Sequence, residues 1–280
     1  MSVHNGAVTL RAAINSLLWQ TFTDWELVIV NDASTDATSQ ICRQFRDCRI
    51  KVIDELQQKG LAARLNQCVE QARGKYVARM DADDIAYPKR FERQVRYLEA
   101  HPDIDLLGHG ALLFTGSGEV VGLYPTAERH EEICRRPWWG FPLAHPTWMG
   151  KRSWFTQHRY DDHLRKGQDQ ELLLRAWRTS RFACLPDCLL GYRVGKVSSL
   201  KSIIGRGHYC CSLLSQVHDR KSAELLIRGV FVHGLALARD VVLDLMDISG
   251  SKIRQSLGAP NAKEVEQWRE VFGRSQEFAS

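Results

Sequence analysis

Three carboxylates stand within four positions of the segment ARMDADDIAYPKR, which spans residues 78–90. Asp81, Asp83 and Asp84 directly follow an apolar stretch, as expected where a buried strand ends. Like charges this close raise one another's pKa, so a positive partner is expected nearby. An Asp-x-Asp pair at a strand end suits Mg²⁺ or Mn²⁺, whose open positions take phosphate oxygens. The alternative is a solvated acidic turn before the helix that begins near Pro88.

Two further acids lie at the ends of predicted elements. Asp32 closes the apolar run ELVIVND and can accept a hydrogen bond from a ring N–H of a base. The alternative is that the residues around Asp32 only form a turn and cap the helix that follows. Asp169 opens the helical pattern GQDQELLLRA and is a candidate general base for an attacking hydroxyl. The alternative there is an acid that stabilises a helix N-terminus.

Strands and helices alternate through residues 1–102. The patterns predict helices at 9–20, 34–45, 60–74 and 87–102, and strands at 26–32, 50–54 and 75–84. Such alternation predicts a mostly parallel sheet covered by helices, with ligands beyond the carboxyl ends of the strands. Asp32 and the acidic cluster are therefore expected to face one crevice.

The pattern changes after residue 103. We expect a hairpin around Thr115–Gly118, an aromatic and proline-rich loop at 136–148, a helix at 167–178 and a last strand at 188–195. From about Ser198 onward the chain is predicted to be helical. One helical stripe is apolar, which favours packing on the preceding domain, with contact to a membrane or partner as the alternative; its members are Leu226, Val230, Leu237, Val241 and Leu245.

Composition restricts the classes of function. The 280 residues are 44% hydrophobic and 25% charged, with a net charge of +5, too weak and too evenly spread to indicate nucleic acid binding. Eight scattered cysteines show no zinc-site spacing and are interpreted as reduced thiols. The first ten residues lack the features of a signal peptide. These observations predict a cytoplasmic protein.

Four segments, taken in order, resemble the family 2 glycosyltransferases with the GT-A fold. They are NGAVTLRAAINSLLWQTFTDWELVIVNDASTDAT, GLAARLNQCVEQARGKYVARMDADDIAYPKRFERQV, AHPTWMGKRSWF and GQDQELLLRAW, and the resemblance covers residues 3–200. It implies an α/β fold with a GT-A-like, mostly parallel sheet flanked by helices and a helical C-terminal appendage. The implied glycosyltransferase domain is 1–198, with a nucleotide-sugar half at 1–102 and an acceptor half at 103–198, followed by a helical region at 199–280.

The resemblance also implies roles for single residues. Asp169 matches the catalytic base, and Asp83, supported by Asp84, matches the ligand of a divalent metal, Mn²⁺ or Mg²⁺. The implied donor contacts are His4, Asp32, Arg64 and Asp81. Because sugar faces pack on aromatic rings, the aromatic loop offers an acceptor platform, with ordinary core packing as the alternative. Its candidate residues are Trp138, Trp139, His145 and Trp148.

Two departures from the family pattern stand out. Gln168 precedes Asp169 where the family has Glu, and the chain opens at MSVHNG without the apolar first strand. Omitting a central strand is expected to open a gap in the core and leave backbone groups unpaired, so we expect the natural chain to be longer by one strand.

The activity implied is an inverting transfer of sugar from a nucleotide-diphosphate sugar, with UDP as the nucleotide, to a hydroxyl acceptor. The acceptor is a saccharide or a lipid-linked saccharide in surface polysaccharide, lipopolysaccharide or glycolipid synthesis, and the protein works in the cytoplasm or at the inner face of the membrane. The alternative is a catalytically inactive binding protein on the same fold. A nucleotidyltransferase is disfavoured because no glycine-rich phosphate loop stands near the start.

Overall fold

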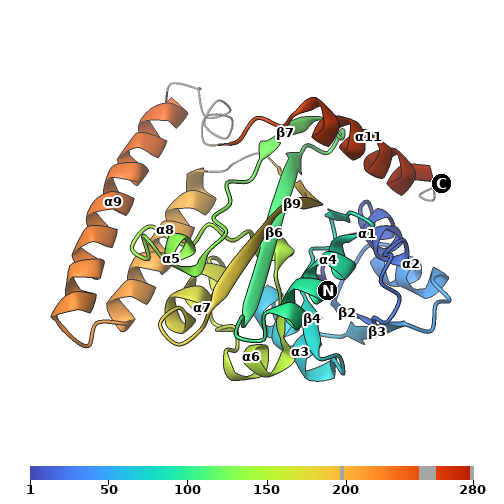
Figure 1. Ribbon diagram of the computed structural model, residues 1–280, viewed down its shortest axis with the longest axis horizontal. Coiled ribbons are helices and arrows are strands. Elements are labelled where there is room, and N and C mark those ends of the chain that lie inside the picture. The colour runs from blue at the N-terminus through green and yellow to red at the C-terminus, as the bar shows by residue number, and fades with distance from the viewer. Residues whose placement is uncertain (196–198, 246–256, 278–280) are drawn as a thin grey trace.

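Two sheets with helices around them form the computed structural model, which describes residues 1–195, 199–245 and 257–277 (Figure 1). The first sheet has the order β1-β2-β3, and both of its pairings are parallel. Its strands are β1 (Ser2–Val3), β2 (Leu27–Asp32) and β3 (Ile50–Glu55). Every residue of β2 is buried, as its apolar sequence predicts for a strand covered on both faces.

The second sheet has the order β4-β8-β6-β9-β5, with β7 paired to β6. Its strands are β4 (Tyr76–Ala78), β5 (Ile85–Ala86), β6 (Leu106–Phe114), β7 (Val120–Leu123), β8 (Met149–Lys151) and β9 (Phe182–Arg193). Only β6 and β9 pair in parallel among these described strands. The predicted α/β architecture and the hairpin of β6 and β7 are confirmed, whereas parallel pairing is less extensive than the alternating pattern predicted.

The helices agree with the predicted segments except at their ends, and except for two short helices, α5 (His130–Ile133) and α6 (Arg152–Gln157), that the sequence did not predict. The others are α1 (Leu10–Leu18), α2 (Thr38–Gln44), α3 (Leu61–Gln71), α4 (Arg90–Ala100), α7 (Gln168–Ala176), α8 (Ser199–Ser215), α9 (Arg220–Leu245) and α11 (Ala262–Glu277), with a 3₁₀ turn at His145–Thr147. Helix α3 ends before Gly74, because Ala72 already has extended backbone angles. In the described part of the chain, no helix combines the length and the apolar character that crossing a bilayer needs.

A cavity of about 750 Å³ separates the two sheets. Its walls include Leu27 and Val28 of β2, the three residues of β4, and Met1. The amino group of Met1 donates to the Val28 carbonyl oxygen at 2.7 Å, and the Val30 N–H donates to the Met1 carbonyl oxygen at 2.9 Å. The predicted gap in the core is therefore present, at the place where one more strand would join β2 to β4.

The C-terminal helices divide into two groups. Helices α8 and α9 form a hairpin at the left of Figure 1, whereas α11 returns across the top to the right-hand side. Trp268 of α11 is buried, its indole N–H donates to the Gly118 carbonyl oxygen at 2.9 Å, and its ring lies 4.4 Å from that of Phe114. A Cβ at Gly191 would lie only 2.1 Å from the Trp268 ring, so β9 needs glycine there. Helix α11 is therefore part of the core beside β6 and β9.

The predicted apolar stripe of α9 packs on the preceding domain only in part: Leu226 is half-buried against the core, and Leu237 is half-buried. Val230 is 51% exposed, and the buried residues are Ser222, Gly229, His233 and Ala236. A Cβ at Gly229 would lie 2.3 Å from the Leu213 side chain, so α8 and α9 approach closely there. The side chains of Val241 and Leu245 lie outside the described residues. All eight cysteines are free thiols, as predicted.

Candidate active site

The acidic cluster follows β4 directly. Oxygens of Asp81, Asp83 and Asp84 lie within 4.8 Å of one another. The crowded carboxylates predicted a positive partner nearby, and the structure has two arginines there. The Arg79 guanidinium donates to both carboxylate oxygens of Asp81, and the Arg193 Nε–H donates to the Asp83 carbonyl oxygen at 2.9 Å. Arg79 and Asp81 follow β4, which ends at Ala78 rather than at residue 84 as predicted, and they stand two positions apart.

Asp84 is the least exposed of the three acids. Its Oδ1 accepts a hydrogen bond from the Arg193 backbone N–H at 2.9 Å, and its Oδ2 has no hydrogen-bond partner among the described residues. Burial, followed by the charges of Asp81 and Asp83, raises the pKa of Asp84 well above its ordinary value. Burial and the charge of Asp81 likewise raise the pKa of Asp83. A divalent cation would satisfy the free oxygen and offset both charges, so these residues fit a metal.

Asp32 lies at the carboxyl end of β2 and is 2% exposed. Its carboxylate accepts hydrogen bonds from the Lys59 and Gly60 backbone N–H groups, both at 2.8 Å, and from Arg64 Nε at 2.6 Å. Burial opposes ionisation, but these three hydrogen bonds outweigh it and lower the pKa of Asp32. Arg64 also lies 3.2 Å from a Glu55 carboxylate oxygen. Both predicted donor residues are thus held within the protein, and their contacts with a nucleotide stay a prediction.

A turn at residues 4–9 lies between Asp32 and the acidic cluster. His4 is exposed, and its Nδ1 lies 2.8 Å from the Asp32 carbonyl oxygen. The Thr9 hydroxyl donates to the Ala82 carbonyl oxygen at 3.0 Å. The turn therefore links the two predicted donor elements, and it places an exposed imidazole beside Asp32, where the sequence predicted a ring near the base.

Asp169 stands in the first turn of α7, after Gly167, which has a left-handed φ of 75°. Burial raises the pKa of Asp169, against the opposing effect of hydrogen bonds from Gln170. The carboxylate lines a cavity of about 640 Å³ between α7, the aromatic loop and the helices α8 and α9. A carboxylate with a raised pKa beside a cavity has the properties of a general base.

The aromatic candidates divide between cavity and core. Trp139 is 44% exposed and lines the cavity that holds Asp169. Trp148 has no exposed surface, and its indole N–H donates to the Leu143 carbonyl oxygen at 3.3 Å, so the packing alternative holds for this residue and it cannot offer a face to a sugar. Trp138 is half-buried, and His145 Nε2 lies 2.8 Å from the Tyr160 hydroxyl oxygen.

Comparison with known proteins identifies the family. The model of the family "Glycosyl transferase family 2" matches residues 1–159. The putative glycosyltransferase EpsE of Bacillus subtilis is 35% identical over 182 residues, which are 62% of this chain and 64% of EpsE, so the chain spans under two thirds of that relative. The O-antigen biosynthesis glycosyltransferase WbnJ of Escherichia coli is 30% identical over 77% of this chain and 85% of its own.

Two solved structures share the fold. The TarS fragment 1–349 of S. aureus, in complex with UDP-GlcNAc, aligns with a TM-score of 0.67 at 18% identity and covers 100% of this chain and 80% of its own. The mannosyltransferase PcManGT of Pyrobaculum calidifontis, in complex with GDP-Man and Mn²⁺, aligns with a TM-score of 0.60 at 17% identity, over 99% of this chain and 84% of its own.

Proposed function

The chain belongs to glycosyl transferase family 2, and we propose that it is a metal-dependent, inverting enzyme that uses a UDP-linked sugar. The acceptor we propose is a hydroxyl of a saccharide or lipid-linked saccharide in surface polysaccharide or glycolipid synthesis. WbnJ, named for O-antigen biosynthesis, supports this class of product. The structures of similar fold, whose titles name UDP-GlcNAc and GDP-Man with Mn²⁺, support a nucleotide-sugar donor and a divalent cation.

The observation that carries the proposal is the acidic cluster with its unpartnered Asp84 oxygen. Because Arg79 occupies both oxygens of Asp81, the carboxylates of Asp83 and Asp84 are the ones left for a cation. A bound Mn²⁺ or Mg²⁺ supplies positive charge that stabilises a departing diphosphate. Asp81, held by Arg79, would then serve as a contact for the donor rather than as a metal ligand.

Asp169 acts on the acceptor in this proposal. Its carboxylate takes the proton of the acceptor hydroxyl, and the hydroxyl oxygen forms a bond to the anomeric carbon. The bond between that carbon and the diphosphate oxygen breaks, and its electron pair leaves with the nucleotide. Because attack and departure take place on opposite faces, the configuration inverts.

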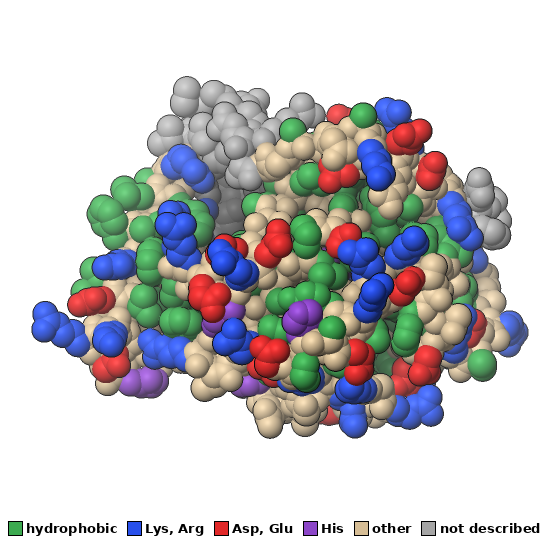
Figure 2. Space-filling view, viewed as in Figure 1, with side chains coloured by type: hydrophobic (Ala, Val, Ile, Leu, Met, Phe, Trp, Pro, Cys, Tyr) green, Lys and Arg blue, Asp and Glu red, His purple; other side chains and the backbone are tan. Residues whose placement is uncertain are grey.

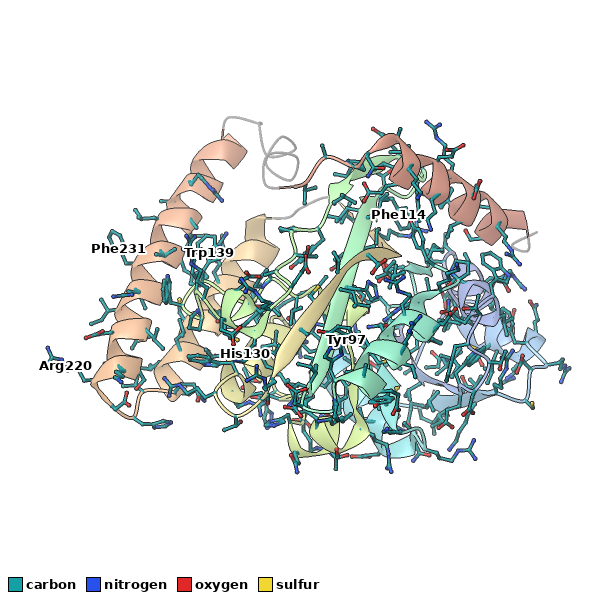
Figure 3. The ribbon with its side chains drawn as sticks, viewed as in Figure 1. Tyr97, Phe114, His130, Trp139, Arg220 and Phe231 are labelled. Carbon is teal, nitrogen blue, oxygen red and sulfur yellow. The ribbon has the colours of Figure 1, made fainter. Side chains whose placement is uncertain are left out.

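We also propose that α9 rests on an anionic membrane surface. Four of its apolar side chains are exposed by half or more, at the helical spacing Ile227, Val230, Phe231 and Leu235. Figure 2 shows hydrophobic side chains over this helix on the left, and Figure 3 shows Phe231 pointing outward from α9 and Arg220 at its lower end. Exposed Arg220, Lys221 and Arg228 flank the apolar face, which is the composition of an interfacial helix.

A second candidate is a non-catalytic binding protein on this fold. The cavity between β2 and β4 favours it, because a gap beside β4 loosens the strand that carries the acidic cluster.

Calorimetric titration of UDP with and without Mn²⁺ separates the two candidates. We expect Mn²⁺-dependent binding that is lost in Asp83→Asn and kept in Asp24→Asn, an exposed acid in a loop outside the described acidic groups. Folded protein that binds no UDP under either condition would contradict the enzyme. Binding that Asp83→Asn leaves unchanged would contradict the metal assignment.

A further inference from the structure

The cavity beside Asp169 is lined by three arginines in addition to the base. Arg135 and Arg136 lie on the loop that follows α5, and Arg206 lies on α8. None of the residues that the sequence predicted for the acceptor is cationic. The cavity therefore offers cationic contacts, and these are used neither by the residues assigned to the donor nor by the proposed base.

Arg135 and Arg136 are exposed, and neither side chain forms an ion pair with a described residue. By contrast, the nearby Arg129 pairs with Glu132, which is one of two acids among the described residues that line the cavity. The second acid is Asp169 itself. Positive charge thus exceeds negative charge around the cavity, because Glu132 is already neutralised.

The loop that carries these arginines is fastened to the base-bearing helix. Gln170, next to Asp169, accepts from the Phe141 N–H at 2.8 Å and donates to the Phe141 carbonyl oxygen at 3.2 Å. The Tyr209 hydroxyl of α8 donates to the Pro137 carbonyl oxygen. The loop backbone that follows the arginines is therefore tied to the helix of Asp169 and to α8.

The inner wall is aromatic. The rings of Trp139 and His233 stack with centroids 5.5 Å apart and an angle of 6°, and Arg206 lies 5.5 Å from the Trp139 ring. Burial, followed by the charge of Arg206, lowers the pKa of His233, so that imidazole is neutral. Figure 3 shows Trp139 on the inner side of α9. Trp139 remains 44% exposed beside these two neighbours, so part of its indole is accessible from the cavity.

We propose that this cavity binds an acceptor that carries a phosphate group, with Arg135 and Arg136 on the phosphate and Trp139 on the sugar. Arginine is the side chain best suited to phosphate, because its planar donors meet two oxygens at once. The inference rests on the proposed function, since the same cavity holds the base. It specifies the chemistry of the acceptor, a glycosyl phosphate or diphosphate, for which the apolar face of the adjacent α9 suits a lipid-linked source.

The test uses a soluble probe and a neutral counterpart. N-acetylglucosamine 1-phosphate and methyl N-acetylglucosaminide are titrated calorimetrically into the full chain with saturating UDP and Mn²⁺, which occupy the donor site. We expect the phosphate form to bind at least about tenfold more tightly, with a preference that weakens as salt is added. The double variant Arg135→Ala, Arg136→Ala should lose this preference, and Arg96→Ala, at an exposed position of α4 outside the cavity, should keep it.

Equal binding of the two sugars, binding of neither, or an unchanged preference in the double variant would overturn the inference. Failure of the proposed function is recognised separately, because the protein would then bind no UDP at all. A sugar linked to farnesyl diphosphate distinguishes the sources of phosphate: tighter binding than the soluble form identifies a lipid carrier, and equal binding identifies a soluble glycosyl phosphate. Both of those outcomes support the phosphate site.

Discussion

The two sides of the site use arginine in opposite ways. On the donor side, Arg64 and Arg79 are almost fully buried, and each is paired with a carboxylate that the sequence assigned to the donor. On the acceptor side, Arg135 and Arg136 are exposed at the mouth of a cavity. Charges on the first side hold the protein's own acids in place, whereas charges on the second side face the cavity that we propose for the acceptor.

The difference predicts that the two sides respond differently to substitution. A buried ion pair that loses one partner leaves an uncompensated charge, so the fold is weakened together with the site. An exposed arginine without a partner contributes little to stability, so its loss affects only the ligand. The predictions below test this division, from the largest expected effect to the smallest.

Asp169 lines the cavity of the acceptor side, and its replacement should give the largest effect. Asp169→Asn keeps the size of the side chain and removes its ability to take a proton. We expect the turnover number to fall by about 10²–10⁴-fold while UDP affinity stays unchanged. Turnover and calorimetric binding are measured on the same preparation, and near-normal turnover would show that another group is the base.

The pH profile of the unaltered protein gives an independent measure of the same residue. Burial raises the pKa of Asp169, and a base is active only when it is deprotonated. Turnover should therefore fall as the pH drops through a value above the ordinary pKa of an aspartate. A profile that stays flat down to the ordinary aspartate range would contradict a buried base.

Arg64 and Arg136 form the direct test of the comparison. Arg64→Ala leaves Asp32 buried without its ion-pair partner, so we expect a loss of about 3–5 kcal/mol in the free energy of unfolding. Arg136→Ala should change that free energy by less than about 0.5 kcal/mol. Urea denaturation measures both. Similar losses in the two variants would remove the distinction between the two sides.

Much of the donor side could be predicted because its signals are local. The runs ELVIVND and IKVID, and the helical spacing of Leu10 and Ile14, each lie within a few residues of one another, and the structure has β2, β3 and α1 there. The strand end at Asp32 followed from the first of these runs, whereas β4 ends at Ala78, before the residue that the sequence predicted. Arg79 could also have been identified, since it stands two positions before Asp81.

The rest depends on contacts between distant segments. Trp148 and Trp139 stand in one aromatic loop, but only the packing of α6, α7 and β9 around the loop decides that Trp148 is buried and Trp139 exposed. The phase of α9 depends on the close approach of α8 at Gly229. The return of α11 depends on Gly191, whose missing side chain leaves room for Trp268. None of these contacts produces a periodic pattern in its own segment.

A weaker effect is expected on the outer face of α9. The double variant Ile227→Ser, Phe231→Ser removes two exposed apolar side chains and should weaken binding to phosphatidylglycerol vesicles by about tenfold, because less apolar area enters the interface. Leu56→Ser is the matched control, since Leu56 is 97% exposed on the donor side. Vesicle sedimentation measures the binding. Equal losses in both proteins, or none, would contradict a membrane role for α9.

The smallest effect has the opposite sign to that of Arg64→Ala. Because the pKa of Asp169 is raised, the folded protein holds this proton more tightly than the unfolded chain does, and folding becomes less favourable as the pH rises through the raised pKa. Asp169→Asn removes the poorly solvated charge, so its melting temperature should exceed that of the unaltered protein at about pH 8 and match it at about pH 4, where the carboxyl group is mostly protonated.

Asp162→Asn, at an exposed position, is the control and should show no such difference at either pH. If Asp169→Asn instead melted at a lower temperature at the higher pH, the Asp169 charge would be stabilised by surrounding groups such as Gln170 and Arg79. The acceptor side would then be organised by internal charge pairing as fully as the donor side. The two sides would then no longer differ in this respect, because Asp169 would belong to the same buried network of charges as Asp81.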